Sequence, residues 1–203
     1  MEKPLIKFAL LLIFVSGIFG LAFILIPKSR VPAPSVPEFV QAGSQITVRE
    51  DITQSPDGTY KLTMKRVKDN GWFAYTFLVS PTGGGTAVEV YKRTAAESDR
   101  FSVPANSFSP DNKFVFIKEN APGNTNYWVM SASGKPLPGG SQAQEISSLF
   151  AAKYENYKIT DVTGWGGLNL IIINTSQETG AEGPSFWFDL TSSSFIRLSS
   201  RFN

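Results

Sequence analysis

Hydrophobic residues are arranged quite differently in the first 26 positions and in the rest of the chain. Residues 8–26 carry no charge over 19 consecutive positions, and fourteen of them are Leu, Ile, Phe or Val. At ~1.5 Å per residue such a helix spans about 28 Å, close to the roughly 30 Å hydrocarbon core of a bilayer. The pattern predicts a single transmembrane helix at 8–26, with the lipid bilayer as one partner of the chain.

The ends of this apolar run favour an uncleaved anchor over a signal peptide. A signal peptide has ~7–15 apolar residues followed by small residues at a cleavage site. Here the run is longer and ends in the sequence Ile24-Leu25-Ile26-Pro27. Two lysines before the run are balanced by Lys28 and Arg30 after it, so the flanking charges do not fix the orientation.

A Pro-rich segment follows the predicted anchor. Residues 27–38 contain four prolines, a density that favours the extended polyproline II conformation. The residues after this segment provide enough chain for one ordinary domain. We therefore expect a short tail at 1–7, the anchor at 8–26, a linker at 27–38 and a domain at 39–203.

Within the predicted domain, a turn followed by a strand recurs. Ser55-Pro56-Asp57-Gly58 precedes an alternating run, and 54 residues later Ser109-Pro110-Asp111-Asn112 precedes an apolar one. Proline presets φ at the second position of a turn, and aspartate accepts hydrogen bonds from nearby backbone amides. A Gly-rich turn at 164–167 introduces a third such run. The pattern predicts three antiparallel units, at about 45–93, 100–138 and 158–199.

Each unit also contains an aromatic strand that ends in a Gly-rich or Ser-rich turn. These strands are expected at 72–80, 126–131 and 185–189, with further strands at 45–50, 86–91, 100–103, 158–163 and 195–199. The strand from Trp72 is apolar on both faces, which predicts sheets covered on both sides. Residues 142–154 lie between the second and third units, and apolar residues at helical spacing there predict a short capping helix: Ile146, Leu149, Phe150 and Tyr154.

The turn, the strand after it, the Tyr/Trp-rich strand and the closing Ser-x-x-Gly turn resemble the WD40-like repeat of TolB-type β-propellers. The resemblance covers residues 53–93, 107–138 and 158–199. It implies an all-β, propeller-like array and an extracytoplasmic location. Propellers usually have four to eight blades, whereas this chain has three units and no N-terminal TolB-type domain. Either a cap or self-association into a larger ring is therefore expected to complete the array.

The amino-acid composition excludes several kinds of functional site. The chain has no cysteine and no histidine, which excludes disulfides, Cys/His zinc sites and histidine acid–base catalysis. The net charge of +2 gives no reason to expect nucleic-acid binding. No cofactor or metal-binding motif is present, so we expect no cofactor, no metal site and no catalytic residues.

A few residues remain candidates for a site. Asp57 and Asp111 recur in the repeat, either as a paired acid or calcium site or, as we favour, as caps of their own turns. Glu178 and Glu182 lie in a Gly/Thr-rich loop that is expected to be solvated. The four Trp residues are interpreted mainly as core. The basic stretch Lys61, Lys65, Arg66 and Lys68 fits either an anionic surface, such as lipid headgroups or wall polymer, or an ordinary outward strand face.

These observations predict a membrane-anchored, single-pass protein whose C-terminal extracytoplasmic module acts in protein binding or scaffolding and not in catalysis. One alternative is an accessory subunit of a cell-envelope or secretion assembly. The other is an enzyme that uses a carboxylate site outside known motifs. The expected partners are the bilayer, through residues 8–26, and either another protein or a second copy of the chain.

Overall fold

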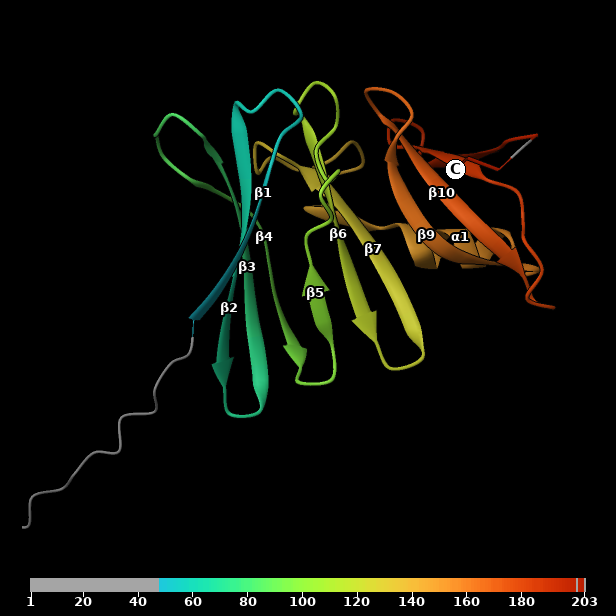
Figure 1. Cartoon of the computed structure of the whole chain (residues 1–203), viewed down its shortest axis with the longest axis horizontal. Coiled ribbons are helices and arrows are strands. Elements are labelled where there is room, and N and C mark those ends of the chain that lie inside the picture. The colour runs from blue at the N-terminus through green and yellow to red at the C-terminus, as the bar shows by residue number, and fades with distance from the viewer. Residues whose placement is uncertain (1–47, 200, 203) are drawn as a thin grey trace, which may run out of the picture. The chain divides into compact units, whose positions relative to one another are not determined.

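The domain consists of β-sheets, as the sequence predicts. A computed structural model describes residues 48–199, 201 and 202. These residues form twelve strands in three four-stranded antiparallel sheets, together with one short helix (Figure 1). None of the helices in this part of the chain is long and apolar enough to cross a membrane. The predicted tail, anchor and linker at residues 1–38 lie outside the described residues.

Each sheet is built from four consecutive strands, so the three units follow one another along the chain. The first sheet comprises β1 (Val48–Gln54), β2 (Tyr60–Asp69), β3 (Trp72–Pro81) and β4 (Val88–Ala96). The second comprises β5 (Arg100–Ser102), β6 (Phe114–Ala121), β7 (Asn124–Ser131) and β8 (Ala143–Glu145). The third comprises β9 (Tyr157–Trp165), β10 (Leu170–Gln177), β11 (Phe186–Asp189) and β12 (Ser194–Arg197).

The turns and loops that connect the strands of the first two sheets lie at two opposite edges. The upper edge in Figure 1 carries the turns at 55–59 and 109–113 and the loops at 82–87 and 132–142. The lower edge carries the β2–β3 and β6–β7 hairpins and the β4–β5 connection at 97–99. Asn70 and Gly71 close the first hairpin with φ angles of 46° and 82°, the left-handed conformations that a two-residue hairpin turn requires.

Two hydrophobic cores hold the three sheets together. One lies between the first and second sheets and includes Met64, Phe77, Val115 and Ile117. The other lies between the second and third sheets and includes Phe116, Val129, Ile173 and Phe188. Neighbouring residues of β6 thus enter opposite cores, because side chains alternate across a strand.

The prediction that every sheet is covered on both sides is wrong for the described residues, among which only the second sheet has a core on each face. The repeat shows how the outer face of the first sheet differs from a face that packs on another sheet. Aligning the turns at Ser55 and Ser109 places Lys61 and Thr63 where the second unit has Val115 and Ile117. Polar side chains thus replace core residues on the face that no other described sheet covers.

The segment between the second and third sheets differs from its prediction. A helix was expected over 142–154, but residues 143–145 pair with β7 as strand β8, and α1 spans only Ile146–Lys153. Ile146 and Phe150 are buried in the second core, while Leu149 is 37% exposed. The predicted apolar face is therefore correct in part. The spacing of apolar residues cannot reveal that the first residues of the expected helix pair with the open edge of β7 as a strand.

Candidate functional site: a cleft between the first two sheets

The first and second sheets separate at the upper edge and leave an open cleft of about 720 Å³. Ligand-binding cavities commonly have volumes of roughly 300–1,000 Å³. The walls are mostly apolar and come from Tyr60, Val79, Val88, Phe114, Ala132 and Pro136. The rim is polar and comes from the two repeated turns and the loop after β7: Asp57, Thr59, Asp111, Asn112, Lys113 and Lys135.

Asp57 is held within its own turn. Its Oδ1 atom accepts hydrogen bonds from Ser55 Oγ at 2.6 Å, from the Thr59 amide at 3.0 Å and from Thr59 Oγ1 at 2.8 Å. Ser55 Oγ in turn accepts from the Tyr60 amide at 2.9 Å, which ties the turn to the start of β2. The Ser55 hydroxyl, followed by the donors of Thr59, holds the pKa of Asp57 well below its usual range.

Asp111 repeats this arrangement in the second unit. Its Oδ1 atom accepts from Ser109 Oγ at 2.8 Å and from the Lys113 amide at 3.2 Å, and Lys113 Nζ lies 3.0 Å from Oδ2. Partial burial acts to raise the pKa of Asp111, but hydrogen bonds from Lys113 and Ser109 outweigh it and the pKa lies below its usual value. The sequence-based interpretation of both aspartates as turn caps agrees with these contacts.

Asn112 connects the two turns. Its Nδ2 atom donates to Asp57 Oδ2 at 2.8 Å and to Thr59 Oγ1 at 3.3 Å. Its Oδ1 atom is buried and has no hydrogen-bond partner within the described part of the chain. The opposite amide orientation would place Oδ1 against the Asp57 carboxylate, so the Asp57 contact fixes the orientation. Asn112 Oδ1, at the rim of the cleft, is therefore a hydrogen-bond acceptor without a donor.

The outer wall of the cleft is formed by a close approach of the two sheets. Gly134, at φ 72°, lies so near β4 that a Cβ atom there would be 2.8 Å from Val88 Cγ1 and 2.9 Å from the Glu89 carbonyl oxygen. Gln142 Nε2 donates to the carbonyl oxygens of Val90 at 2.9 Å and Gly134 at 3.0 Å. These contacts hold the loop after β7 against β4.

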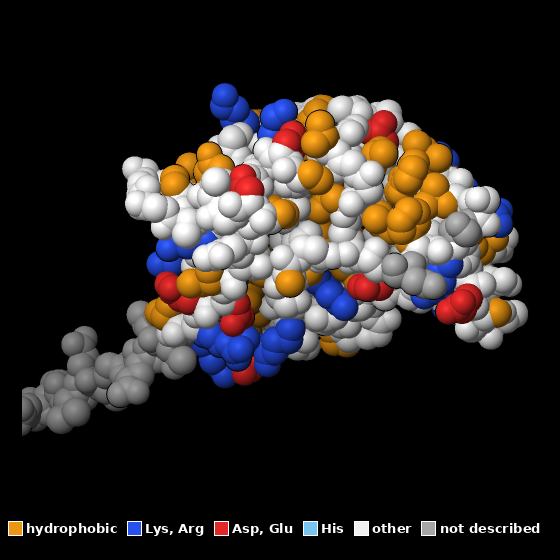
Figure 2. Space-filling model, turned by 45° about the horizontal axis from the view of Figure 1, so that its top comes forward, with side chains coloured by type: hydrophobic (Ala, Val, Ile, Leu, Met, Phe, Trp, Pro, Cys, Tyr) orange, Lys and Arg blue, Asp and Glu red, His pale blue; other side chains and the backbone are white. Residues whose placement is uncertain are grey.

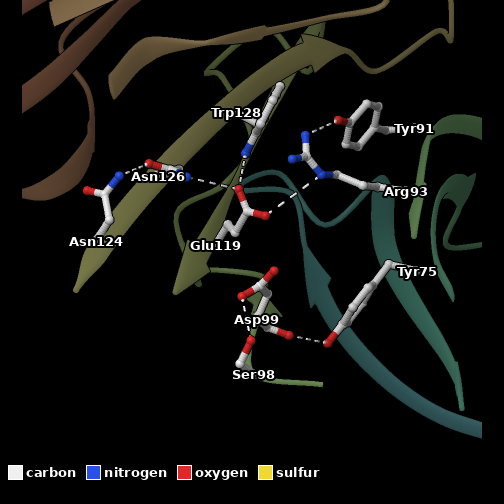
Figure 3. A network of polar contacts seen from close by, with 9 residues as sticks. All are labelled: Tyr75, Tyr91, Arg93, Ser98, Asp99, Glu119, Asn124, Asn126 and Trp128. Atoms are coloured by element: carbon white, nitrogen blue, oxygen red, sulfur yellow. Dashed lines mark hydrogen bonds and ion pairs between the residues drawn. The ribbon is translucent and has the colours of Figure 1, made fainter. Parts of the chain in front are cut away.

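Toward the lower edge, a polar network closes the same interface (Figure 3). Glu119 is buried and accepts hydrogen bonds from Trp128 Nε1 at 2.9 Å and Asn126 Nδ2 at 3.2 Å. Arg93 Nε, from the first sheet, lies 3.7 Å from Glu119 Oε1, and the guanidinium lies 4.4 Å from the Trp128 ring centroid. Burial acts to lower the pKa of Arg93, but Tyr91 and Glu119 outweigh it and raise the pKa.

The cleft is suited to binding. Its two carboxylates already accept hydrogen bonds and have lowered pKa values, which makes them poor proton acceptors at neutral pH. Over residues 48–199, 201 and 202, no group of three or more acidic residues could hold a metal ion. What remains is an apolar trough with charges at its mouth, an arrangement that suits the apolar side chains of a ligand.

The other candidate residues lie away from this cleft. Glu182 is exposed and lies 3.7 Å from Arg201, in the loop between β10 and β11. Trp128 and Trp165 pack partly buried against the cores, whereas Trp72 is 54% exposed. Sequence reasoning did not identify Glu119. The only signal is a single acid between Lys118 and Asn120 in the second half of β6, which gives no indication of its partner across the sheets.

The basic stretch that was predicted as one surface is divided between two faces. Register pairs Leu62 and Met64 with core residues of β3, so Lys61 and Lys65 point to the outer face of the first sheet. Arg66 and Lys68 are on the opposite face, and both lie over the ring of Phe73. The alternation of side chains along β2 causes this division.

Comparison with known proteins does not assign the chain to a family. No family model matches it, and no match was found among curated proteins.

Proposed function

We propose that this chain is a membrane-anchored, extracytoplasmic binding module with propeller-like repeats, and that its cleft holds an apolar segment of a protein partner. The observation that carries the proposal is the open cleft of about 720 Å³ between the first two sheets. Its walls are formed by apolar side chains from both units, and Tyr60 and Val88 remain 39% and 40% exposed. Exposed apolar groups in a concave site release water when a partner covers them.

The two carboxylates of the rim support binding over catalysis. A general base must be able to take a proton near neutral pH, and Asp57 and Asp111 are held ionised by donors of their own turns. Lys113 is paired with Asp111 at 3.0 Å. The rim charges are thus positioned to orient a ligand at the mouth of the cleft while its apolar side chains enter.

The sequence supports the other parts of the proposal. The apolar run at 8–26 has the length of a membrane span. Three successive four-stranded antiparallel sheets that share two cores are consistent with the propeller-like repeat that the turns resemble. The extracytoplasmic placement follows from that resemblance. It predicts that protease added to intact cells cleaves the domain, and protection from protease would contradict it.

The cleft is tested by selecting peptides from a random display library on the full chain held in lipid nanodiscs. We expect Val88→Asp to abolish binding of the selected peptides, because it places a charge in the apolar wall. Ile196→Asp is the matched control, because it introduces the same charge at an apolar side chain that is 46% exposed in the third sheet. Equal losses in the two variants, or no enrichment of apolar peptides, would count against the cleft.

A second candidate function is that of an accessory subunit of an envelope assembly. The third sheet favours it, because Ile172, Trp187 and Ile196 pair in register across the face that points away from the second core. Figure 2 shows an apolar patch on the right of the molecule, the side that holds the third sheet in Figure 1. Stable co-purification with membrane subunits, lost in Ile196→Asp and kept in Val88→Asp, would support this function over the first.

A further inference from the structure

Basic side chains gather around one aromatic ring at the lower edge of the first sheet. Phe73 is buried, and its ring centroid lies 4.8 Å from Arg66 Cζ, 4.9 Å from Arg100 Cζ and 5.9 Å from Lys68 Nζ. Arg49 pairs in register with Arg66. Figure 2 shows Lys and Arg side chains gathered at the lower left, on the side where β1 begins in Figure 1.

The contacts with the Phe73 ring stabilise the fold, whereas the pairing of two arginines opposes it. Like charges directly opposite each other on paired strands are destabilising, and Arg49 lies opposite Arg66. Lys68 is paired with Glu97 at 2.6 Å and Arg49 with Asp51 at 3.4 Å. Within residues 48–199, Arg66 and Arg100 form neither an ion pair nor a hydrogen bond through their side chains. Two guanidinium groups at this edge therefore lack a direct acidic partner, although Arg100, after Lys68, helps to lower the pKa of the Glu97 carboxyl.

An exposed aromatic residue lies at the same edge. Trp72 is 54% exposed and pairs with Asp69 across the Asn70–Gly71 turn. Its side chain lies at the tip of the hairpin, on the opposite face of β3 from Phe73 and the basic side chains around it. Exposed indole rings are typical of protein surfaces that rest at the interface between water and lipid.

We propose that this edge, formed by Arg49, Arg66, Lys68, Arg100 and Trp72 and here called the basic tip, docks on anionic lipid headgroups of the membrane. The inference rests on the proposed anchoring of the chain. Twenty-one residues, 27–47, separate the apolar run from Val48 at the start of β1, on the edge that carries the basic tip. At up to about 3.6 Å per residue they reach at most about 76 Å.

Because the proposed anchor keeps the domain near the bilayer, a weak electrostatic contact is sufficient for docking. A linker of this length keeps the domain at high effective concentration beside the bilayer. Phosphate groups of anionic lipids match the geometry of guanidinium donors. Attraction between basic residues and an anionic leaflet falls off within a Debye length, so the docked state is expected to be sensitive to salt.

The test uses the full chain reconstituted in vesicles of phosphatidylcholine, with or without phosphatidylglycerol, whose acyl chains carry bromine as a quencher. The difference in Trp fluorescence between the native chain and Trp72→Phe reports on Trp72. We expect Trp72 to be quenched only in vesicles with phosphatidylglycerol, and the quenching to disappear at high salt. Arg66→Gln combined with Arg100→Gln is expected to lower the ratio of docked to undocked chain by about 30-fold, from roughly fivefold per cation.

Two further variants separate charge from folding. Lys153→Gln with Lys158→Gln removes the same charge from exposed positions in α1 and β9 and is expected to leave quenching unchanged. Arg66→Lys with Arg100→Lys keeps the charge and is expected to retain most of the docking. If the Lys153/Lys158 control reduces quenching as much as the Arg66/Arg100 pair, the basic tip is not the docking surface.

The outcomes separate the anchor from the docking surface. Flotation of the chain with vesicles of phosphatidylcholine alone tests the anchor, and failure to float refutes the proposed anchoring. A chain that floats but shows no quenching dependent on phosphatidylglycerol refutes only the docking. Tighter binding of soluble poly(glycerol phosphate) than of the anionic vesicle, lost in the Arg66/Arg100 variant, would overturn the lipid assignment in favour of an anionic polymer.

Discussion

Asn112 donates a hydrogen bond from Nδ2 to Asp57 Oδ2 over 2.8 Å, and so joins the turn of the second unit to that of the first. The two residues are 55 positions apart in the sequence and lie in equivalent turns of successive repeats. The second turn has Asn where the first has Gly58, and both adopt positive φ, 58° and 72°. Asparagine is the residue that tolerates this conformation and also carries a donor.

This contact predicts a graded response at Asn112. Asn112→Gly removes the hydrogen bond but keeps a residue suited to positive φ, and is expected to lower the free energy of unfolding modestly. Asn112→Ala loses the same hydrogen bond and leaves at positive φ a residue that tolerates the left-handed region less well than Gly or Asn, which costs about 1 kcal/mol more than the Gly variant. Urea unfolding of the full chain in non-ionic detergent, followed by Trp fluorescence, measures both. Equal stability of the Gly and Ala variants would show that the backbone at Asn112 is not held at positive φ.

The strands of the first two units could largely be predicted, because their signals are local. Turns such as Ser-Pro-Asp-Gly act within a few residues, and the alternation of β2 follows from its own sequence. Strand β8 could not be predicted, because residues 143–145 become a strand only by pairing with β7. Nor could the uncovered outer face of the first sheet be read from β3, whose two faces are both rich in apolar residues.

The candidate site was predicted only in part, for the same reason. Asp57 and Asp111 were identified, and their roles as turn caps follow from residues two positions away. The cleft depends on Val88 and Gly134 approaching each other from different sheets, and no local pattern encodes that distance. The division of the basic stretch between two faces was accessible from the sequence, since side chains alternate along a strand.

The turn carboxylates predict how stability depends on pH. Hydrogen bonds from Ser55 for Asp57 and from Thr191 for Asp189 hold their pKa values below the ordinary range, and Asp111 is lowered as well. Below about pH 5 the unfolded chain therefore binds more protons than the folded one, and stability falls as the pH falls toward the folded-state pKa values. Above that range all three are ionised in both states, and their contribution is constant.

Urea midpoints measured from neutral pH down to about pH 3 test this expectation. Asp57→Asn combined with Asp111→Asn and Asp189→Asn is expected to flatten the loss of stability in acid. Glu178→Gln, in the exposed loop after β10, serves as the control and is expected to leave the dependence unchanged. A triple variant with the acid sensitivity of the native chain would mean that other carboxylates control the transition.

Gly134 predicts a steric effect that a second glycine isolates. Gly134→Ala and Gly58→Ala both place a Cβ at φ 72°, but Gly58 has no atom within 4 Å of the added Cβ, whereas Gly134 meets β4 at under 3 Å. Gly58→Ala is expected to cost about 1 kcal/mol from the backbone alone. Gly134→Ala should cost about 1–3 kcal/mol more, as overpacking does. Equal losses of stability in urea would show that the loop after β7 moves away from β4 freely.

The ion pair between Arg93 and Glu119 predicts strong coupling across the first interface. Only 4% of the Glu119 side chain is exposed, and Arg93 is the only cation within 4 Å of it among the described residues. Removing one partner of a buried pair leaves an uncompensated charge. We expect Arg93→Met, which keeps much of the packing over Trp128, to lower the free energy of unfolding by about 2–3 kcal/mol. This is less than a fully buried pair would lose, because Arg93 is 36% exposed.

A double-mutant cycle separates this charge effect from lost contacts. Glu119→Gln removes the charge and leaves an oxygen that can accept from Trp128 Nε1, 2.9 Å away in the native chain. Once residue 119 is neutral, the loss of Arg93 no longer leaves a buried charge without a partner. The double variant is therefore expected to be more stable, by about 1–2 kcal/mol, than the sum of the two single losses of stability predicts. The four proteins are compared by urea unfolding at neutral pH. Strict additivity would mean that water, and not Arg93, compensates the charge of Glu119.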